Sequence, residues 1–251
     1  TPDGRYKLAQ LVRANRAIDD VCRAYQLPCI SGKDSMKNDV TMHGEKISVP
    51  PTILFSLIGN HNDVRKAVSS DFKQVGDHIF LLGETHHELG ASEVAYMFRD
   101  ECSGGIGGRA PAIDAERNLA MYRALTGAMS RGLVASAHDC SDGGLAVSLA
   151  ECCFGAGSGA SVEISELGSN DPDLDSFGAL FSESLGRILV SVSPENSQAF
   201  TEAMQGHTCH RLGSVSEGDN LSVTSEGTPT LTASVSVLKQ SWQGSLGGGA
   251  Q

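Results

Sequence analysis

Short apolar runs alternate with helical segments along most of this chain, and this alternation constrains the fold more than any other feature. Strands are expected at 79–82, 134–138 and 187–193, and near 161–164, 209–215 and 220–224. Helices are expected after Ser92 as N-cap, at 112–131, at 145–154, near 195–204 and in a last short segment ending at Trp242. Several strand pairings should be antiparallel. The pattern therefore predicts an α/β (α+β) fold, a mixed β-sheet flanked by helices.

The first 62 residues follow a different pattern. Over residues 6–25, apolar side chains recur mostly three, four or seven apart, which predicts an amphipathic helix ended by Pro28. Cys29–Ile30 is expected to be a short strand, and a hairpin with its turn at 43–45 should follow. The almost continuously apolar run Ile53–Ile58 is typical of a strand buried on both faces.

The apolar pattern breaks around residues 60–63, where we place a domain boundary. Residues 1–62 would form one part, residues 63–243 an α/β domain, and the glycine-rich residues 244–251 a flexible tail. A length of 251 residues allows one large domain or two ordinary ones. Residue 1 is Thr rather than Met, which indicates processing or a piece of a longer protein.

Charge and hydropathy argue against several classes of protein. Lys and Arg number 19 against 30 Asp and Glu, a formal net charge of −11, whereas nucleic-acid surfaces need clustered basic residues. The longest apolar runs are far shorter than the roughly 20 residues that cross a bilayer, and we see no signal peptide. We therefore expect a cytoplasmic protein with no nucleic-acid and no membrane partner. One local cationic site for a phosphate ligand remains compatible with this charge.

The seven cysteines contain no C-x-x-C pair and no repeated spacing, and are expected to be buried thiols in a reducing compartment. A metal site at His207, Cys209 and His210 would lack a second pair at zinc-finger spacing. Cys140 invites a nucleophile interpretation, but no base can be named for it. The glycine loop at 104–108 resembles a phosphate cradle only in composition, because no strand precedes it.

The first loop that could carry chemistry is Ser31–Asp39. Gly32 would let the backbone approach a phosphate, Lys33 would supply charge and Ser35 would supply a hydroxyl donor. Asp34 or Asp39 could take part through a magnesium ion. The segment is not a P-loop, because Asp rather than Ser or Thr follows the lysine. The alternative is an ordinary polar turn.

The second loop, His138–Leu145, lies between an expected strand and an expected helix. Backbone N–H groups and the positive end of the helix dipole would face a ligand there. Asp139 and Asp142 could hold Mg²⁺ through oxygen ligands, and Ser141 could contact a phosphate oxygen. The alternative has Ser141 or Asp142 as a plain N-cap, with the two following glycines allowing close packing. Farther along, Glu183 and Arg187 are expected to form a surface pair.

Four segments in order resemble one known family. From about Tyr6 to Trp242, this chain is similar to the C-terminal synthetase half of phosphoribosylformylglycinamidine synthase, an enzyme of purine biosynthesis. The resemblance implies an AIR synthase-like C-terminal domain preceded by the trailing part of an AIR synthase-like N-terminal domain. The segments that carry it are Ser31–Asp39, Leu89–Glu93, His138–Ala146 and Leu180–Arg187.

The family's reaction is ATP-dependent amidine formation. ATP phosphorylates the amide oxygen of formylglycinamide ribonucleotide, and ammonia from a glutaminase displaces the phosphate. The resemblance implies ATP or ADP and Mg²⁺ as cofactors. The implied partners are the second synthetase half and a glutaminase subunit or domain. Without the family's preceding strands, an exposed apolar face at Ile53–Ile58 would favour a homodimer of the fragment.

By motif, Gly32 and Lys33 would contact a nucleotide phosphate, Ser35 nucleotide or substrate, Asp139 would ligate magnesium and Ser141 would contact nucleotide. Small forms of the enzyme have Asn at the place of Lys33, and this leaves open whether the loop serves a catalytic or a structural nucleotide site. The family's catalytic histidine lies in a half that this sequence does not contain, so no catalytic residue is assigned. The alternatives are a non-catalytic nucleotide-binding and assembly module, or another enzyme of the superfamily.

Overall fold

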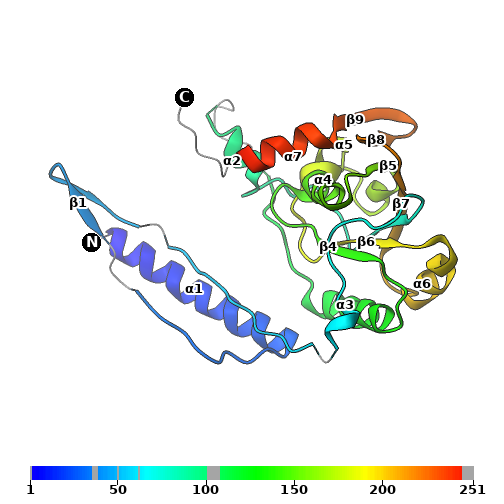
Figure 1. Ribbon diagram of the computed structural model, residues 1–251. Coiled ribbons are helices and arrows are strands. Elements are labelled where there is room, and N and C mark those ends of the chain that lie inside the picture. The colour runs from blue at the N-terminus through cyan, green and yellow to red at the C-terminus, as the bar shows by residue number, and fades with distance from the viewer. Residues whose placement is uncertain (1, 36–38, 50, 62, 101–107, 245–251) are drawn as a thin grey trace. The chain divides into compact units, whose positions relative to one another are not determined.

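The computed structural model describes residues 2–35, 39–49, 51–61, 63–100 and 108–244, and the chain divides into two compact units, residues 1–62 and 63–251. The first contains α1 (Pro2–Tyr25) and a hairpin of β1 (Val40–Met42) and β2 (Glu45–Ile47) (Figure 1). Whether this unit is the trailing part of an AIR synthase-like N-terminal domain stays a prediction.

The second unit carries the main sheet and its helices. Its elements in chain order are η1 (Val64–Lys66), β3 (His78–Leu82), α2 (Glu93–Met97), α3 (Ala115–Ser130), β4 (Ser136–Asp139), α4 (Gly144–Ala156), β5 (Gly159–Glu163), η2 (Ser165–Asn170), α5 (Ser176–Phe181), β6 (Ile188–Val192), η3 (Pro194–Asn196), α6 (Ser197–Ala203), β7 (Cys209–Ser216), β8 (Asn220–Ser225), β9 (Thr228–Ser234) and α7 (Val235–Gly244).

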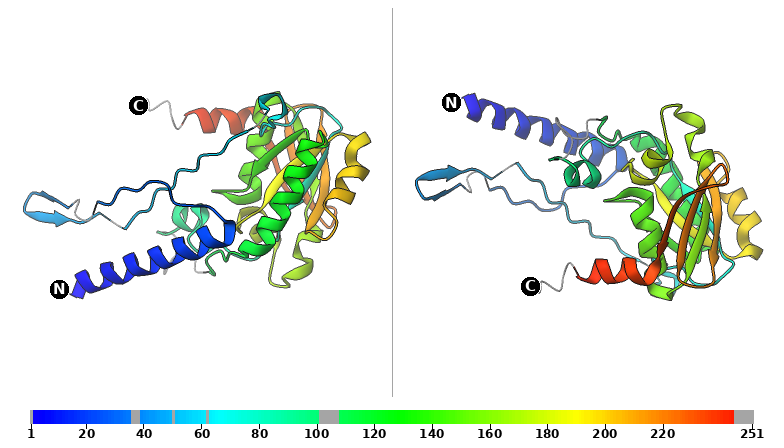
Figure 2. Two further views of the ribbon diagram at one scale, coloured as in Figure 1. Left: turned by 90° about the horizontal axis from the view of Figure 1, so that it is seen from below. Right: turned by 90° about the horizontal axis from the view of Figure 1, so that it is seen from above.

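The sheet has seven strands in the order β4-β6-β3-β7-β5-β8-β9. The β5–β8 pair is parallel and every other pair is antiparallel. Figures 1 and 2 show helices on both sides of this sheet. The predicted mixed sheet flanked by helices is confirmed.

Strand β3 lies inside the sheet and separates two apolar cores. Ile79 and Leu81 pack on one face with side chains of α4, α5 and α7, whereas Phe80 and Leu82 pack on the other with α3 and α6. Successive side chains of a strand point to opposite faces, so a fully apolar run is what a strand covered on both faces requires. All four side chains are at most 3 % exposed.

Most elements expected beyond residue 63 are confirmed within a few residues, including the Ser92 cap of α2, where the Ser92 hydroxyl accepts from the Ala95 N–H. One strand and one α-helix of this unit were not predicted. Strand β9 lies at the sheet edge and its burial follows no apolar alternation; Pro229, which lacks an N–H, is tolerated there. Helix α5 has only six residues, too few for a periodic signal.

In the first unit the helix and the hairpin are confirmed, but two expected strands are wrong. Cys29–Ile30 and Ile53–Ile58 have no regular structure. The large apolar side chains of the second segment are exposed, from 51 % for Ile53 to 90 % for Leu54. A strand needs neighbours for its backbone hydrogen bonds and cover for its side chains, and no described residue of this unit supplies either.

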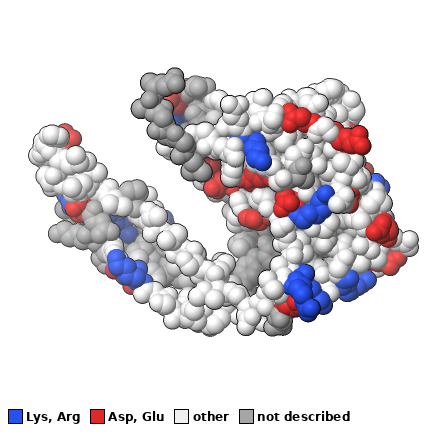
Figure 3. Space-filling view, in the orientation of Figure 1, with Lys and Arg blue, Asp and Glu red and all other residues white. Residues whose placement is uncertain are grey.

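Charges of both signs are interspersed over the second unit on the face that Figure 3 shows, with no continuous basic field among the described residues on that face. Among the helices of the described residues, none is long and apolar enough to span a membrane.

Candidate functional site

The turn between β4 and α4 is built on two glycines. Gly143 and Gly144 both have left-handed backbone conformations, with φ of 78° and 65°. A Cβ on Gly144 would lie 2.5 Å from the Ser182 carbonyl oxygen. A side chain at Gly144 would therefore meet both backbone strain and a backbone clash, so the close packing that the sequence suggested for this pair is present.

Helix α4 has no side-chain cap at its N-cap, Gly143, so the N-cap interpretation of Ser141 or Asp142 is wrong. Glu183 takes that role from another segment. Its Oε1 accepts the Gly143 N–H at 2.9 Å and the Glu93 N–H, at the start of α2, also at 2.9 Å. A carboxylate thus already compensates the positive end of α4. The expected surface pair of Glu183 with Arg187 is also wrong, since Arg187 is only 1 % exposed.

Asp139, the last residue of β4, and Ser141 lie together in this turn. The Ser141 hydroxyl donates to the Asp139 carboxylate, and this bond lowers the pKa of Asp139 below its ordinary value. His138 Nδ1 lies 3.5 Å from the same carboxylate, and its Nε2 lies 3.1 Å from Glu151. The Asp139 side chain remains 75 % exposed. It is therefore an accessible carboxylate that is ionised at neutral pH.

The turn forms one wall of an open cavity of about 590 Å³, within the usual range for small-molecule sites. Acidic groups dominate its charge. Its lining residues are Pro111, Tyr122, Asp139, Cys140, Ser141, Asp142, Glu183, Leu185, Gly186, Arg187 and Ile188.

The buried guanidinium of Arg187 holds the segment that follows α5. Its Nη2 donates to the Ser182 carbonyl, its Nε to the Ser184 carbonyl at 3.3 Å, and its Nη1 to the Thr85 hydroxyl at 3.2 Å. Burial lowers the pKa of Arg187. Ser182 is therefore fixed on both sides, since its hydroxyl also accepts the Glu88 N–H at 3.0 Å.

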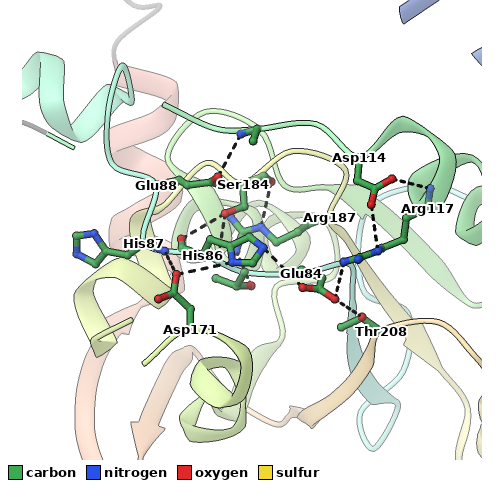
Figure 4. A network of polar contacts seen from close by, with 12 residues as sticks. Glu84, His86, His87, Glu88, Asp114, Arg117, Asp171, Ser184, Arg187 and Thr208 are labelled. Carbon is green, nitrogen blue, oxygen red and sulfur yellow. Dashed lines mark hydrogen bonds and ion pairs between the residues drawn. The ribbon is translucent and has the colours of Figure 1, made fainter. Parts of the chain in front are cut away.

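Polar contacts continue from Arg187 along the segment after β3, as Figure 4 shows. His86 lies between two carboxylates, with Nε2 3.6 Å from Glu84 and Nδ1 3.7 Å from Asp171. Arg117 of α3 pairs with Glu84 at 2.8 Å. Glu88 is 2 % exposed and accepts the Ala112 N–H at 3.1 Å. These contacts join segments distant in sequence and order the residues beside the cavity.

The other predicted loop belongs to the first unit. Residues 31–35 have no regular structure and are exposed, and the Lys33 ammonium donates to the Ser35 hydroxyl at 2.6 Å. A Cβ on Gly32 would meet no atom within 4 Å, so no close backbone approach requires glycine there. Asp39 is engaged by Lys46 at 2.7 Å. Residues 36–38 lie outside the described residues.

Weaker candidates gain little support. Cys140 is 8 % exposed and burial raises its pKa, which disfavours a thiolate nucleophile. Within the described ranges, no group of three or more His, Cys, Asp and Glu side chains is arranged to hold a metal, and this includes His207, Cys209 and His210. The glycine loop at 104–108 falls almost wholly outside those ranges.

The sequence did not predict Glu183 as a partner of the α4 turn, although Glu183 lies in Leu180–Arg187, one of the four segments that carry the family resemblance. No spacing rule signals the contact, because 40 residues separate Glu183 from Gly143. Arg187 likewise gave no sign of burial, since most arginines are exposed.

Comparisons with known proteins agree with this architecture. The family described as AIR synthase related protein, C-terminal domain, matches residues 74–226. The structure of T. maritima PurL complexed with FGAR is 20 % identical with a TM-score of 0.60, over 70 % of this chain and 30 % of that one. PurL complexed with ATP is 21 % identical with a TM-score of 0.56, over 70 % and 27 %. Phosphoribosylformylglycinamidine synthase II from Thermotoga maritima is 20 % identical with a TM-score of 0.58, over 70 % and 28 %. This chain thus spans less than a third of those chains and shares their fold.

Proposed function

The chain belongs to the AIR synthase related family, whose C-terminal domain it contains, and from this premise we propose that it is part of a phosphoribosylformylglycinamidine synthase. That ATP-dependent carbon–nitrogen ligase converts formylglycinamide ribonucleotide, ATP and ammonia from glutamine to formylglycinamidine ribonucleotide, ADP and phosphate. The observation that carries the proposal is the cavity at the Asp139–Gly144 turn. It lies in a domain that shares its fold with PurL chains whose complexes contain ATP and FGAR.

The charge of the cavity supports a metal-bound nucleotide. A bare phosphate at the start of α4 would meet the carboxylates of Asp139, Asp142 and Glu183, and Glu183 already accepts the Gly143 N–H. Like charges repel at close range, so the triphosphate needs a cation between itself and these carboxylates of the cavity. With such a cation in place, the net charge of −11 on the chain is compatible with ATP binding.

Asp139 fits the role of magnesium ligand. Mg²⁺ keeps several waters and is held by one or two carboxylates together with substrate phosphates, so it needs no dedicated protein cage. Asp139 is exposed, and its lowered pKa keeps it ionised at neutral pH. Bound Mg²⁺ would supply charge neutralisation to the phosphates. Ser141, whose hydroxyl orients the carboxylate, would contact the nucleotide.

In the first unit, Gly32 and Lys33 would contact a nucleotide phosphate, and Ser35 would contact nucleotide or substrate. Lys33 and Ser35 are exposed and already in contact. A flexible ammonium suits a phosphate as a compact charge. The second synthetase half and a glutaminase would complete the enzyme, in the cytoplasm, and we expect this chain alone to be inactive. Association of the fragment as a homodimer through its exposed apolar residues remains part of the proposal.

Lys33 also favours a second candidate, a non-catalytic nucleotide site that assembles the same enzyme. A protonated lysine cannot take the place of the metal-ligating asparagine found in small forms of the family. In that case the 251-residue chain contributes residues to a structural nucleotide site, and turnover occurs at another site.

Nucleotide binding by the 251-residue chain tests the proposed site. ATP and ADP titrations with and without Mg²⁺ should show metal-dependent binding, and Asp139→Asn should weaken it by at least about tenfold. Asp173→Asn, the same change at an exposed residue outside the cavity, is the matched control. Equal binding by the Asp139 variant, or binding that ignores Mg²⁺, would exclude Asp139 as the ligand.

A longer enzyme containing both synthetase halves separates the remaining cases. Loss of turnover in Asp139→Asn with unchanged thermal stability indicates the catalytic site, whereas loss of stability and of tightly retained ADP indicates the structural site. ATPase activity stimulated by formylglycinamide ribonucleotide supports the synthase, and stimulation by another substrate indicates a different enzyme of the superfamily. Amidine formation by the 251-residue chain alone would show that the missing half is dispensable.

A further inference from the structure

Two thiols meet at the C-terminal end of α1. The Sγ atoms of Cys22 and Cys29 lie 3.7 Å apart, close to the distance at which a small rotation of either side chain permits a disulfide bond of about 2 Å. We propose that Cys22 and Cys29 form a reversible redox pair that closes to a disulfide when the chain meets a peroxide.

The end of the helix brings the two residues together. The Leu27 N–H donates to the Cys22 carbonyl at 2.9 Å and the Gln26 N–H to the Arg23 carbonyl at 3.2 Å, which is the hydrogen-bond pattern of a Schellman motif. Gln26 takes the left-handed conformation that the motif needs, with φ of 59°. The chain therefore turns back on the last turn of α1 and carries Cys29 toward Cys22.

Access to solvent distinguishes Cys29 from the other described cysteines. Cys29 is exposed and Cys22 half-buried, and both line a shallow cavity of about 520 Å³. Burial raises the pKa of the other four described thiols, at 140, 152, 153 and 209. Oxidation favours accessible thiols, and Cys29 is the exposed one among the described cysteines, so the pair at α1 is the preferred target among them.

The chemistry assigns a different part to each thiol. Cys29 is the exposed thiol of the pair and Cys22 the half-buried one, so Cys29 is the thiol that meets hydrogen peroxide and attacks it as its thiolate. An S–O bond forms, the O–O bond breaks, and the leaving hydroxide takes a proton to become water. Cys22 then attacks the Cys29 sulfenic acid: the S–S bond forms, the S–O bond breaks, and the Cys22 proton leaves with the hydroxide as a second water. Two thiols and one peroxide give one disulfide and two waters.

Closure would alter a segment that leads to the first loop. Cys29 lies three residues before Gly32, and the disulfide would hold residues 22–29 in a small ring at the helix end. The redox state of the pair thus constrains the backbone from which Gly32 and Lys33 follow. The pair does not depend on the proposed nucleotide site, so its test stands apart from that function.

Trypsin gives a direct readout, because it cuts at Arg23 between the two cysteines. The peptides 17–23 and 24–33 carry one cysteine each. After limited hydrogen peroxide treatment of the reduced native chain, the two should appear as one linked species, two hydrogens lighter than their sum, and dithiothreitol should separate them. Cys102 lies outside the described residues, so Cys102→Ser serves as the background throughout.

Single variants test the order of the steps. In Cys22→Ser, the Cys29 sulfenic acid has no resolving partner and should accumulate as a dimedone adduct, whereas Cys29→Ser should give little adduct at residue 22. Cys209→Ser is the control and should link the peptides like the background. Linking should slow when the chain is oxidised in denaturant. Unlinked peptides, links between chains only, or linking as fast in the unfolded chain would each overturn the proposal.

Discussion

Two apolar runs of similar composition differ in this molecule: one forms a buried strand and the other is exposed and forms no strand. Phe80, Leu81 and their neighbours in β3 are at most 3 % exposed, whereas Leu54, Leu57 and Ile58 in the first unit are 80 to 90 % exposed and belong to no strand. Strand β3 has β6 and β7 as neighbours and helices on both faces. An apolar run is stabilised when it is buried, and whether it is buried depends on the strands and helices around it.

The largest expected effect tests this contrast directly. Leu81→Ala should destabilise the second unit by about 2–5 kcal/mol, because it leaves a cavity in a closed core. Leu57→Ala, the same change at an 80 % exposed side chain, should alter stability by about 0.5 kcal/mol or less. Urea denaturation of the 251-residue chain measures both. Similar losses for the two variants would mean that residues 53–58 are covered in solution.

A backbone test concerns the turn beside the cavity. Gly144→Ala should cost about 1–3 kcal/mol for the left-handed conformation, in addition to displacing the Ser182 carbonyl. Gly127→Ala is the matched control within α3, where an added Cβ meets no atom within 4 Å and should stabilise the helix by about 0.5–1 kcal/mol. Thermal melts of both variants decide the matter. The prediction fails if both changes shift the melting temperature in the same direction.

The charge at the start of α4 should have a smaller effect. Glu183→Gln keeps an oxygen that can accept the Gly143 and Glu93 N–H groups but removes the charge that faces the helix dipole. A loss of about 0.3–1 kcal/mol is expected, and it should shrink as salt is added. Glu166→Gln, at an exposed residue elsewhere in the unit, provides the comparison. An unchanged melting temperature at low salt would show that the carboxylate is dispensable for the turn.

The two units should respond differently to acid pH, because each is stabilised by a different carboxylate with a lowered pKa. Hydrogen bonds from the Ser165 N–H and the Thr224 hydroxyl hold the pKa of Glu163 at about 2 in the second unit. The Lys46 ammonium and the Ser48 hydroxyl lower the pKa of Asp39 in the first. A lowered folded-state pKa means that stabilisation is complete above the ordinary carboxyl pKa and is lost as pH falls through the folded value.

The expected result is a loss of stability of the second unit between about pH 4.5 and pH 2 that is smaller in Glu163→Gln. Protonation of Asp39 should loosen the hairpin of the first unit without affecting the sheet. Circular dichroism and urea titrations at several pH values follow both changes. An acid dependence of Glu163→Gln identical to that of the parent chain would contradict the assignment.

Local signals predicted a good part of the fold. Ser92 caps α2 as expected, and the order of strands and helices beyond residue 63 was sufficient to predict a mixed sheet. Interactions between distant segments were not predictable. The cap of α4 comes from Glu183, on a segment 40 residues away, instead of from Ser141 or Asp142. Spacing rules apply only within one element, so they could not identify that partner.

The same division holds for the candidate site and for the chain as a whole. The sequence alone indicated the apolar periodicities, the close packing that the glycine pair allows, and the motif residues Asp139 and Ser141, because each depends on chemistry local to the chain. Tertiary structure alone decided that Arg187 is buried, that Asp139 lines a cavity and that residues 53–58 form no strand. Burial and pairing are properties of two surfaces, and one segment of sequence describes only one of them.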